Sequence, residues 1–506
     1  MQYIYYLAVG VIAAVVSYPL TNFVGIMARR WGFVDRPDGH HKSHKQEVAL
    51  GGGLAVFLAA AVTFLVEYVF SDPLQGILLE AHYLGGLLLA GAWIVCLGLY
   101  DDRFGMRGRY KLLGQIVAAV IVISAGLKIE SFVLFEQKFE LVGPVSIAFT
   151  IFWLVGAMNS LNLLDGIDGL ATTIGIILCA TITIMALLFG QPAVAVVGAV
   201  FTGSLLGFLR FNFPPAKIFL GDAGSMLIGL VVGTLAIGGS LKGPATVAMA
   251  APLAIWALPI FDSVAAIMRR KLTGRSIYDT DRGHLHHRLM SMFGKNTRVL
   301  AVVAVCCAVT CAGALLSTFM KNDLVAILAV VSVLLMLVAT QAFGHVEFLM
   351  IFARLKSLVL RTFGKNVPRE YSFRLQGSRD WKMMWQSITE FAEKLELIEV
   401  KLDLNLAALQ EGFHATWRQP SASEKQERWS ADVPLFAEEH LIGRLLVCGI
   451  RPAGKTSCEA IQQFMELLEP LESEILALAT SQESQQTLSP PETISASGTS
   501  SELSVG

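Results

Sequence analysis

The chain has 506 residues, of which 54% are hydrophobic and only 16% are charged. Soluble domains carry about 25% charged residues, so this composition excludes an ordinary soluble enzyme. The formal net charge of −1 gives no electrostatic basis for a nucleic-acid partner, and the 7 cysteines are too sparse for a disulfide scaffold. We therefore predict a polytopic membrane protein.

Long apolar stretches follow one another over residues 1–343. A helix that crosses a membrane needs about 20 apolar residues. Stretches that approach this length lie at 3–28, 50–69, 83–100, 112–127, 145–162, 170–189, 193–210, 224–238, 245–268, 299–319 and 324–343. The predicted fold is thus an all-α polytopic membrane protein of about eleven transmembrane helices, followed by a small cytoplasmic α+β domain.

Basic residues predict the orientation, because Lys and Arg collect in cytoplasmic loops. One set of loops holds Arg29, Arg30, Arg36, Lys42, Lys45, Arg103, Arg107, Arg109, Lys111, Arg210, Lys217 and the basic run at 269–298. The opposite loops hold Lys128, Lys138, Lys242 and Lys321. We therefore place the N-terminus outside and the C-terminus in the cytoplasm. The alternating segment 130–141 predicts a short hairpin on the outer side.

Beyond residue 343 the composition becomes charged and mixed. We predict a transmembrane domain at 1–343, a basic juxtamembrane linker at 344–370, an α+β accessory domain at 371–480 and a disordered tail at 481–506. Within the accessory domain, apolar patterning predicts helices at 380–396 and 457–479 and strands at 400–406, 413–419 and 441–450.

Four polar motifs interrupt the apolar sequence at the predicted cytoplasmic ends of the spans. The first is GLYDDR at 98–103. Because adjacent carboxylates repel each other, Asp101 and Asp102 indicate a bound cation or a base. A pair at a helix end that faces Arg103 and Arg107 is an equal alternative.

The second motif is NSLNLLDGIDGLA at 159–171. Asn159, Asn162 and Asp165 are spaced three apart, so one helical face presents two amides and a carboxylate. A carboxylate at mid-membrane costs roughly 2.5–3.5 kcal/mol, so these groups and Asp168 belong at the interface or in a wet cavity. The alternative is a turn that caps the next helix.

The third motif is FLGDAGS at 219–225. Asp222 precedes small residues that open a span, which suits either a helix cap or close approach of a phosphate–metal group. The fourth is RGHLHHR at 282–288, in which Arg282, His284, His286 and His287 suit an oxyanion site. A solvated basic loop is the alternative for this last motif.

Together these four motifs resemble those of the polyprenyl-phosphate N-acetylhexosamine-1-phosphate transferases, glycosyltransferase family 4. They resemble most the branch that makes undecaprenyl-diphospho-N-acetylglucosamine. The resemblance covers about residues 1–343, and the loop at 32–53 also fits, although the family usually has prolines near Glu47 and Ala49.

The resemblance implies a bacterial inner-membrane enzyme that transfers a sugar-1-phosphate from UDP-GlcNAc to undecaprenyl phosphate, releases UMP and starts a cell-envelope polysaccharide. It implies Mg2+, or alternatively Mn2+, as cofactor, with Asp222 and Asp165 as metal ligands. Asp101 and Asp102 are then the catalytic residues. Asn159, Asn162, Asp165 and Asp168 bind the nucleotide and diphosphate, and Arg282, His284, His286 and His287 bind the sugar-phosphate.

The alternatives to this function are a different donor sugar, a membrane transporter and an inactive scaffold. Another UDP-N-acetylhexosamine in the same chemistry stays open, as does a homodimer. A transporter would place polar groups near the middle of the bilayer and repeat its halves, which the sequence does not do. An inactive scaffold for the accessory domain would not need the acidic residues of the first three motifs.

Overall fold

The computed structural model describes residues 2–36, 47–70, 82–134, 137–241, 253–254, 256–273, 283–362, 369–376, 381–395, 397–406, 411–419, 428–437, 440–450 and 462. The chain divides into two compact units, Met1–Ile351 and Phe352–Gly506. The first unit therefore continues past residue 343, where the last apolar stretch ends. The two units are described separately below.

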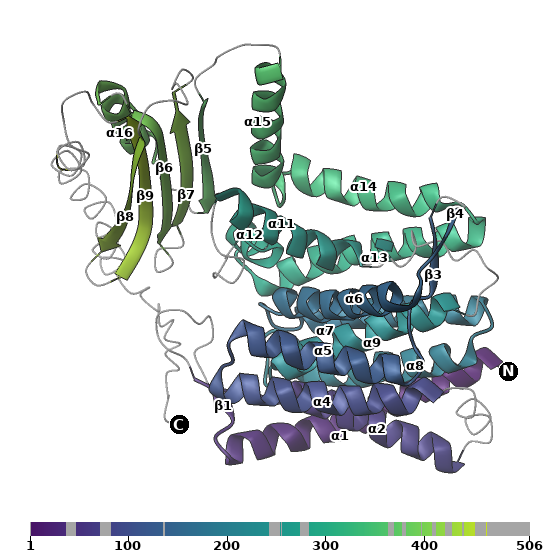
Figure 1. Cartoon of the computed structure of the whole chain (residues 1–506). Coiled ribbons are helices and arrows are strands. Elements are labelled where there is room, and N and C mark those ends of the chain that lie inside the picture. Colours follow the sequence, from purple (N-terminus) through teal and green to yellow (C-terminus); the bar gives the residue numbers. More distant parts are fainter. Residues whose placement is uncertain are drawn as a thin grey trace, which may run out of the picture. The chain divides into compact units, whose positions relative to one another are not determined.

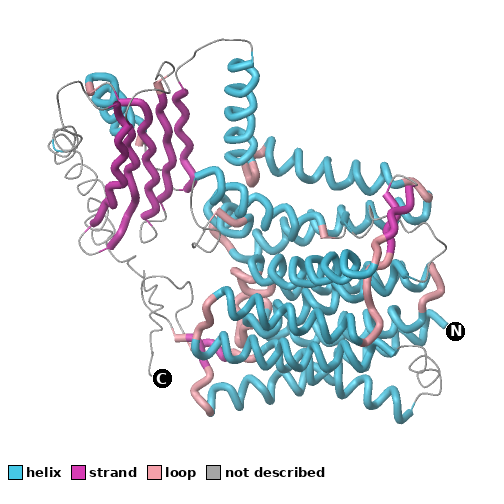
Figure 2. The backbone as a smooth tube through the Cα atoms, in the orientation of Figure 1, coloured by secondary structure: helices cyan, strands magenta, loops and turns pink. Residues whose placement is uncertain are grey.

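The first unit is a helical bundle with the helices running side by side (Figures 1 and 2). In chain order the helices are α1 (Gln2–Arg30), α2 (Gly52–Phe70), α4 (His82–Phe104), α5 (Gly108–Ser124), α6 (Gly143–Leu164), α7 (Leu170–Leu188), α8 (Pro192–Asn212), α9 (Gly221–Leu241), α11 (Ala257–Thr273), α12 (Leu285–Phe293), α13 (Asn296–Met320) and α14 (Asp323–Ala339). Helix α15 (His345–Thr362) begins in this unit and continues beyond its end at Ile351.

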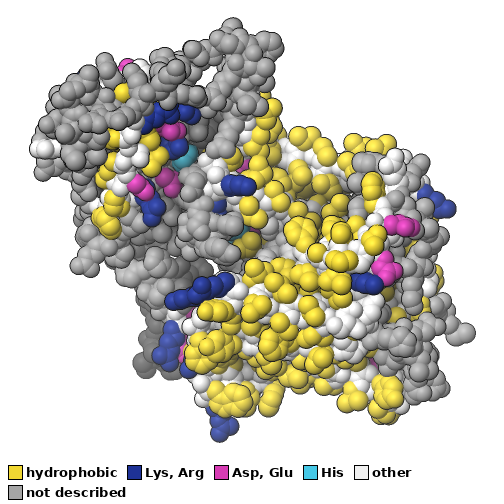
Figure 3. Space-filling view, in the orientation of Figure 1, with side chains coloured by type: hydrophobic (Ala, Val, Ile, Leu, Met, Phe, Trp, Pro, Cys, Tyr) yellow, Lys and Arg dark blue, Asp and Glu magenta, His cyan; other side chains and the backbone are white. Residues whose placement is uncertain are grey.

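Eight of the described helices are long and apolar enough to cross a membrane: α1, α2, α4, α6, α7, α8, α9 and α13. Helices α5 and α14 have only 17 residues each, and only residues 253–254 and 256–268 of the predicted span 245–268 are described, most of them in α11. The total of eleven spans and their orientation therefore remain predictions. Hydrophobic side chains cover the face of the bundle seen in Figure 3, as expected for a multi-pass membrane protein.

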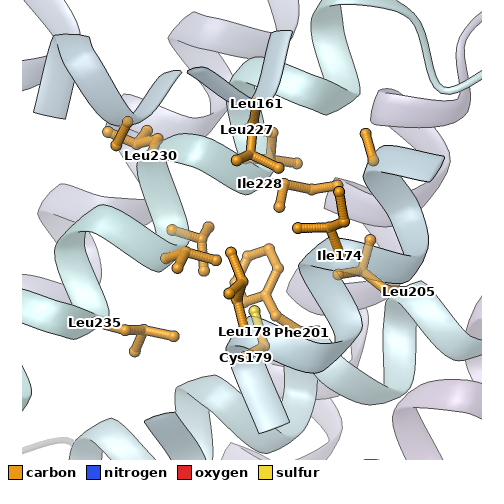
Figure 4. Close-up of a cluster of buried hydrophobic side chains, with 14 of the residues drawn as sticks. Leu161, Ile174, Leu178, Cys179, Phe201, Leu205, Leu227, Ile228, Leu230 and Leu235 are labelled. Atoms are coloured by element: carbon orange, nitrogen blue, oxygen red, sulfur yellow. The ribbon is translucent and has the colours of Figure 1, made fainter. Parts of the chain in front are cut away.

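Helix α9 packs against α2, α4, α6, α7 and α8. Buried side chains of α6, α7, α8 and α9 meet in an apolar cluster that includes Leu161, Ile174, Phe201, Leu227 and Ile228 (Figure 4). Since lipid tails are as apolar as these side chains, close van der Waals packing stabilises such contacts between membrane helices.

Glycines allow two neighbouring helices to approach the first turn of α9. A Cβ atom on Gly53 of α2 would lie 2.2 Å from the backbone nitrogen of Gly224. A Cβ atom on Gly98 of α4 would lie 2.2 Å from the Cα atom of Ala223. Because Gly53 and Gly98 have no side chains, the acidic end of α4 can lie directly against the N-terminus of α9.

Short strands connect the loops at both ends of the bundle. β1 (Val34–Asp35) pairs antiparallel with β2 (Val48–Ala49), and Ala49 also bridges to Ile218 just before α9. At the other end, β3 (Ser131–Leu134) and β4 (Gln137–Glu140) form an antiparallel pair, which confirms the predicted hairpin.

The second unit contains a five-stranded antiparallel sheet with the order β5-β7-β6-β9-β8. The strands are β5 (Arg369–Gln376), β6 (Leu397–Leu406), β7 (Glu411–Arg418), β8 (Arg428–Ala437) and β9 (His440–Ile450). Helix α16 (Lys382–Lys394) contacts β6, and Trp385, Val400, Leu402 and Trp417 belong to the core of this unit.

The three predicted strands and the helix at 380–396 are confirmed in type. The sequence prediction missed β5 and β8, the two edge strands. Edge strands bury less apolar surface, and β8 contains Pro434, which a sheet tolerates at its edge but which argues against a strand in the sequence. The predicted helix 457–479, except residue 462, and the tail 481–506 lie outside the described residues.

Candidate functional site

Polar side chains from four helix ends meet in the first unit. They come from the C-terminal ends of α4 and α6 and from the N-terminal ends of α5 and α9. Three of the four sequence motifs are thereby brought together, although the first and third lie 120 residues apart.

Asp222, in the first turn of α9, makes most of these contacts. Lys111 of α5 places its Nζ atom 2.6 Å from Oδ2 of Asp222 and 3.0 Å from Oδ2 of Asp101. Asn162 of α6 donates from Nδ2 to Oδ1 of Asp222 at 2.6 Å and to the Ser225 hydroxyl at 3.0 Å. Lys111 also donates to Oδ1 of Asn162. The orientation of the Asn162 amide is therefore fixed by Lys111 at its oxygen and by Asp222 at its nitrogen.

Asp101 and Asp102 have different surroundings. The Asp101 carboxylate faces Lys111, whereas Asp102 accepts hydrogen bonds from the backbone nitrogens of Asp222 at 2.8 Å and Ala223 at 3.5 Å. Asp102 therefore caps α9 from a neighbouring helix. Arg103 instead donates to the carbonyl oxygen of Gly32, so the acidic pair does not face Arg103.

The amides of the second motif lie on the predicted face of α6. One turn before Asn162, Asn159 exchanges hydrogen bonds with Gln115 of α5, at 2.8 Å and 3.3 Å. Helix α6 ends at Leu164, so Asp165 and Asp168 belong to the following turn.

Asp165 and Asp168 differ in their contacts. Asp168 accepts a hydrogen bond from the backbone nitrogen of Ala216 at 3.0 Å and so holds the segment before α9. The Asp165 carboxylate accepts no hydrogen bond from the residues that the structure describes. Burial, with the nearby carboxylates of Asp222, Asp102 and Asp168, raises the pKa of Asp165 well above its usual range.

The fourth motif is described from residue 283 onward, and the predicted ligand Arg282 lies outside the described residues. His284 Nδ1 lies 2.8 Å from Oδ2 of the buried Asp262, on α11. The rings of His284 and His286 are stacked at 6.0 Å, and the ring of His287 lies 4.2 Å from that of His286.

The buried His286 connects this motif to the second one. A Cβ atom on Gly166 would lie 2.0 Å from Nε2 of His286, so the ring rests against the backbone next to Asp165. Burial lowers the pKa of His286 well below its usual range, with smaller effects from His287 and His284. A neutral imidazole therefore adjoins the Asp165 turn.

The sequence interpretation missed Lys111, Gln115 and Asp262 as site residues. Lys111 counted only as one of several basic loop residues that set the orientation. Asp262 had a usable signal, because it is the one acidic residue of the apolar stretch 245–268, and ionisable residues within spans indicate function.

No three His, Cys, Asp or Glu side chains cluster as a metal site within the part of the chain that the structure describes. Mg2+ is commonly held by one or two carboxylates together with substrate phosphates and water, so such a cluster is not required. The side chain of Asp222 is 33% exposed, and that of Asp165 accepts no hydrogen bond from the described residues, which fits oxygen ligands available to a hydrated cation.

The fold and the site define a multi-pass membrane protein with an acidic and histidine-bearing centre at one end of its bundle. Residues 84–240 match glycosyl transferase family 4. A Bacillus subtilis protein named "Probable undecaprenyl-phosphate N-acetylglucosaminyl 1-phosphate transferase" is 35% identical over 56% of this chain and 76% of its own length. The chain therefore belongs to glycosyl transferase family 4.

Two further relatives agree with this membership. A decaprenyl-phosphate N-acetylglucosaminephosphotransferase of Mycolicibacterium smegmatis is 31% identical over 66% of this chain and 87% of the relative. An undecaprenyl-phosphate alpha-N-acetylglucosaminyl 1-phosphate transferase of Thermotoga maritima is 29% identical over 58% of this chain and 84% of the relative.

Proposed function

We propose that this protein transfers N-acetylglucosamine-1-phosphate from UDP-N-acetylglucosamine to undecaprenyl phosphate and releases UMP. The observation that carries the proposal is the convergence of Asp101, Lys111, Asn162 and Asp222, next to the His286 segment, at one end of the bundle. The membership of the family and the names of its relatives supply the reaction class.

The reaction brings two anions together, because a phosphate oxygen of the lipid attacks the phosphorus of the diphosphate that carries the sugar. The bond between that phosphorus and the bridging oxygen breaks, and UMP leaves with the electron pair. Positive charge held in place lowers the barrier to such a transfer. Lys111 supplies an ammonium group held by Asp101 and Asp222.

A divalent cation fits beside Lys111. Asp222 and Asp165 are the proposed ligands, because one carboxylate is partly exposed and the other accepts no hydrogen bond from described residues. When bound, Mg2+ would neutralise and polarise the substrate phosphates, and Mn2+ accepts the same oxygen ligands.

The remaining residues bind and orient the substrates in this proposal. A phosphate monoester has its second pKa at about 6, so the lipid phosphate is mostly ionised at neutral pH and needs no strong base. Asp101 therefore acts mainly by orienting Lys111, and Asp102 by holding α9. Asn159, Asn162 and Asp168 serve the nucleotide and diphosphate, and the histidine segment with Arg282 serves the sugar-phosphate.

We place the site on the cytoplasmic side of a bacterial inner membrane, where a soluble nucleotide sugar meets a membrane lipid. The product would then start a cell-envelope polysaccharide, with the protein acting as a monomer or homodimer. Single-cysteine labelling should reach 103–109, 213–217 and 283–288 from the cytoplasm. Labelling of 283–288 only from outside would divide the site between two faces and contradict this placement.

The transfer itself is tested with purified protein, undecaprenyl phosphate and UDP-sugars labelled in the sugar. UDP-N-acetylglucosamine should give labelled lipid and UMP, and a chelator should stop the reaction. Asp222→Asn should lower turnover by about 100-fold or more, because it removes the charge and keeps the shape. Glu130→Gln in the exposed hairpin region is the matched control. Faster transfer from another UDP-N-acetylhexosamine would reassign the donor.

A further inference from the structure

Helix α11 carries buried charged residues that the proposed function does not use, among them Asp262 and Arg269. Asp262 is 0% exposed and Arg269, two turns further along the same helix, is 3% exposed. Both contact the short segment 283–285 that precedes the histidine-bearing helix α12. Burying a charged group costs free energy unless hydrogen bonds or an opposite charge compensate it, so the partners of these two side chains indicate what they do.

Both carboxylate oxygens of Asp262 are committed to this segment. Oδ2 lies 2.8 Å from Nδ1 of His284, and Oδ1 accepts a hydrogen bond from the backbone nitrogen of Leu285 at 2.7 Å. Leu285 is the first residue of α12, and the His284 side chain does not cap that helix. One side chain of α11 thus orients the His284 ring and satisfies an otherwise open backbone donor at the start of α12.

We propose that Asp262 is a positioning residue for the transfer reaction, acting through His284 to hold the histidine segment against the Asp165 turn. The contacts form a continuous path: His284 stacks on His286 at 6.0 Å, and His286 rests on Gly166, next to Asp165. This inference rests on the proposed function, since it concerns which residue places the sugar-phosphate ligands.

Arg269 holds the beginning of the same segment. A Cβ atom on Gly283 would lie 2.3 Å from the guanidinium carbon of Arg269, so backbone and guanidinium are in close contact. Arg269 also forms a buried ion pair with Glu347, near the start of α15. Arg269 and Asp262 therefore hold the segment to α11 on either side of His284. If the contact with Asp262 is lost, Arg269 still holds the segment at Gly283.

A double-mutant cycle tests the role of Asp262. Asp262→Asn keeps an oxygen acceptor for the Leu285 nitrogen but loses the second carboxylate oxygen, which faces Nδ1 of His284. We expect kcat to fall by about 10-fold to 100-fold, as is typical when the partner of a functional histidine is changed. In a His284→Ala background the same change should lower kcat by less than about threefold, because the side chain through which Asp262 acts is already missing.

Ser263→Ala is the matched control on the neighbouring position, where the hydroxyl contacts Ser160 and the Pro259 carbonyl oxygen. The kcat of this variant should stay within about threefold of the wild-type value, which is also the limit set for the effect of Asp262→Asn in the His284→Ala background. Full activity of Asp262→Asn, or losses that multiply in the double variant, would overturn the inference. If the wild type itself made no labelled lipid, the proposed function would fail instead.

A second pair of variants keeps the test decisive if Asp262→Asn does not fold. The side-chain nitrogen of asparagine can take the place of Nδ1, so His284→Asn retains a donor toward Asp262, whereas His284→Ala does not. We expect the asparagine variant to keep at least about 10-fold more activity than the alanine variant. Equal activity of the two variants would show that the contact with Asp262 contributes nothing to positioning.

Discussion

The ammonium nitrogen of Lys111 lies 2.6 Å from a carboxylate oxygen of Asp222, although the two residues are 111 positions apart in the chain. The same nitrogen contacts Asp101 at 3.0 Å. Lys111 thus compensates carboxylates from two different helices, and its side chain is only 15% exposed. Without it, the acidic end of the bundle would repel both anionic substrates.

Lys111→Met should therefore reduce turnover by about 100-fold to 1,000-fold, the usual cost of losing a preorganised charge at a reacting phosphate. Transfer of labelled sugar-phosphate into lipid measures this directly. Lys128→Met serves as the control, because Lys128 is half-buried and pairs with Glu130 away from the site. Comparable loss in both variants would mean that general damage, and not the site charge, is responsible.

Gly221→Ala should unfold the first turn of α9 more readily. Gly221 has φ of 71°, and a Cβ atom there would lie 2.5 Å from Oδ2 of Asp102, the carboxylate that caps α9. We expect a loss of about 1–2 kcal/mol from the left-handed backbone alone, seen as a lower melting temperature in detergent, together with lower activity. Gly156→Ala, in an open helical position, should not be destabilising.

Much of the first unit could be predicted from its apolar stretches and its four motifs. The helix-like spacing of Asn159 and Asn162 placed them on one face, and the alternation at 130–141 gave the hairpin. What could not be predicted is which side chains meet across helices. The pairing of Lys111 with Asp222, or of Asp102 with the α9 backbone, depends on close packing at Gly98 and Ala223.

The stability of the protein should fall on acidification through the titration of His286. Burial lowers the pKa of His286 in the folded state, so below about pH 6.5 the unfolded chain binds a proton that the folded protein does not. The stability associated with the neutral ring is therefore present above that pH and lost as the pH falls. The melting temperature of wild type in detergent should drop more steeply between pH 7 and pH 5 than that of His286→Gln.

The effect of Asp165 on stability changes with pH in the opposite direction, because burial raises the pKa of its carboxyl group. Wild type and His286→Gln both contain Asp165, so its contribution cancels when their slopes are compared. His345→Gln, which changes a histidine of α15 outside the site, is the control for the substitution itself. Identical slopes for wild type and His286→Gln would show that the ring titrates normally in the folded protein.

A chain that ends after Thr362 should still make the lipid-linked sugar, whereas one that ends after Phe343 should not accumulate. The shorter chain lacks Glu347, and removing one partner of a buried ion pair costs about 3–5 kcal/mol. Glu347→Gln in the full chain should show a similar loss of stability. If the longer truncation folds but is inactive, the second unit contributes to the catalytic site.

The role of Glu347 also shows where sequence patterns stop being informative. The predicted boundary at residue 343 follows the end of the last apolar stretch, whereas the first compact unit extends to Ile351. A buried ion pair between Arg269 of α11 and Glu347 is one of the contacts that attach the start of α15 to the bundle. Such a pair produces no periodic pattern in the sequence, because it consists of one basic and one acidic residue at distant positions.

The cap that Asp102 provides to α9 also has a consequence for the order in which the protein is assembled during synthesis. The two partners are separated by 120 residues, whereas Asp262 and Leu285 are separated by only 23. At about 5–20 residues per second, the ribosome needs roughly 6–24 s to make the chain between Asp102 and Asp222. During that interval, Asp102 lacks the α9 backbone that it caps, whereas Asp101 can already pair with Lys111, and Asp262 meets the backbone of Leu285 soon after both are made.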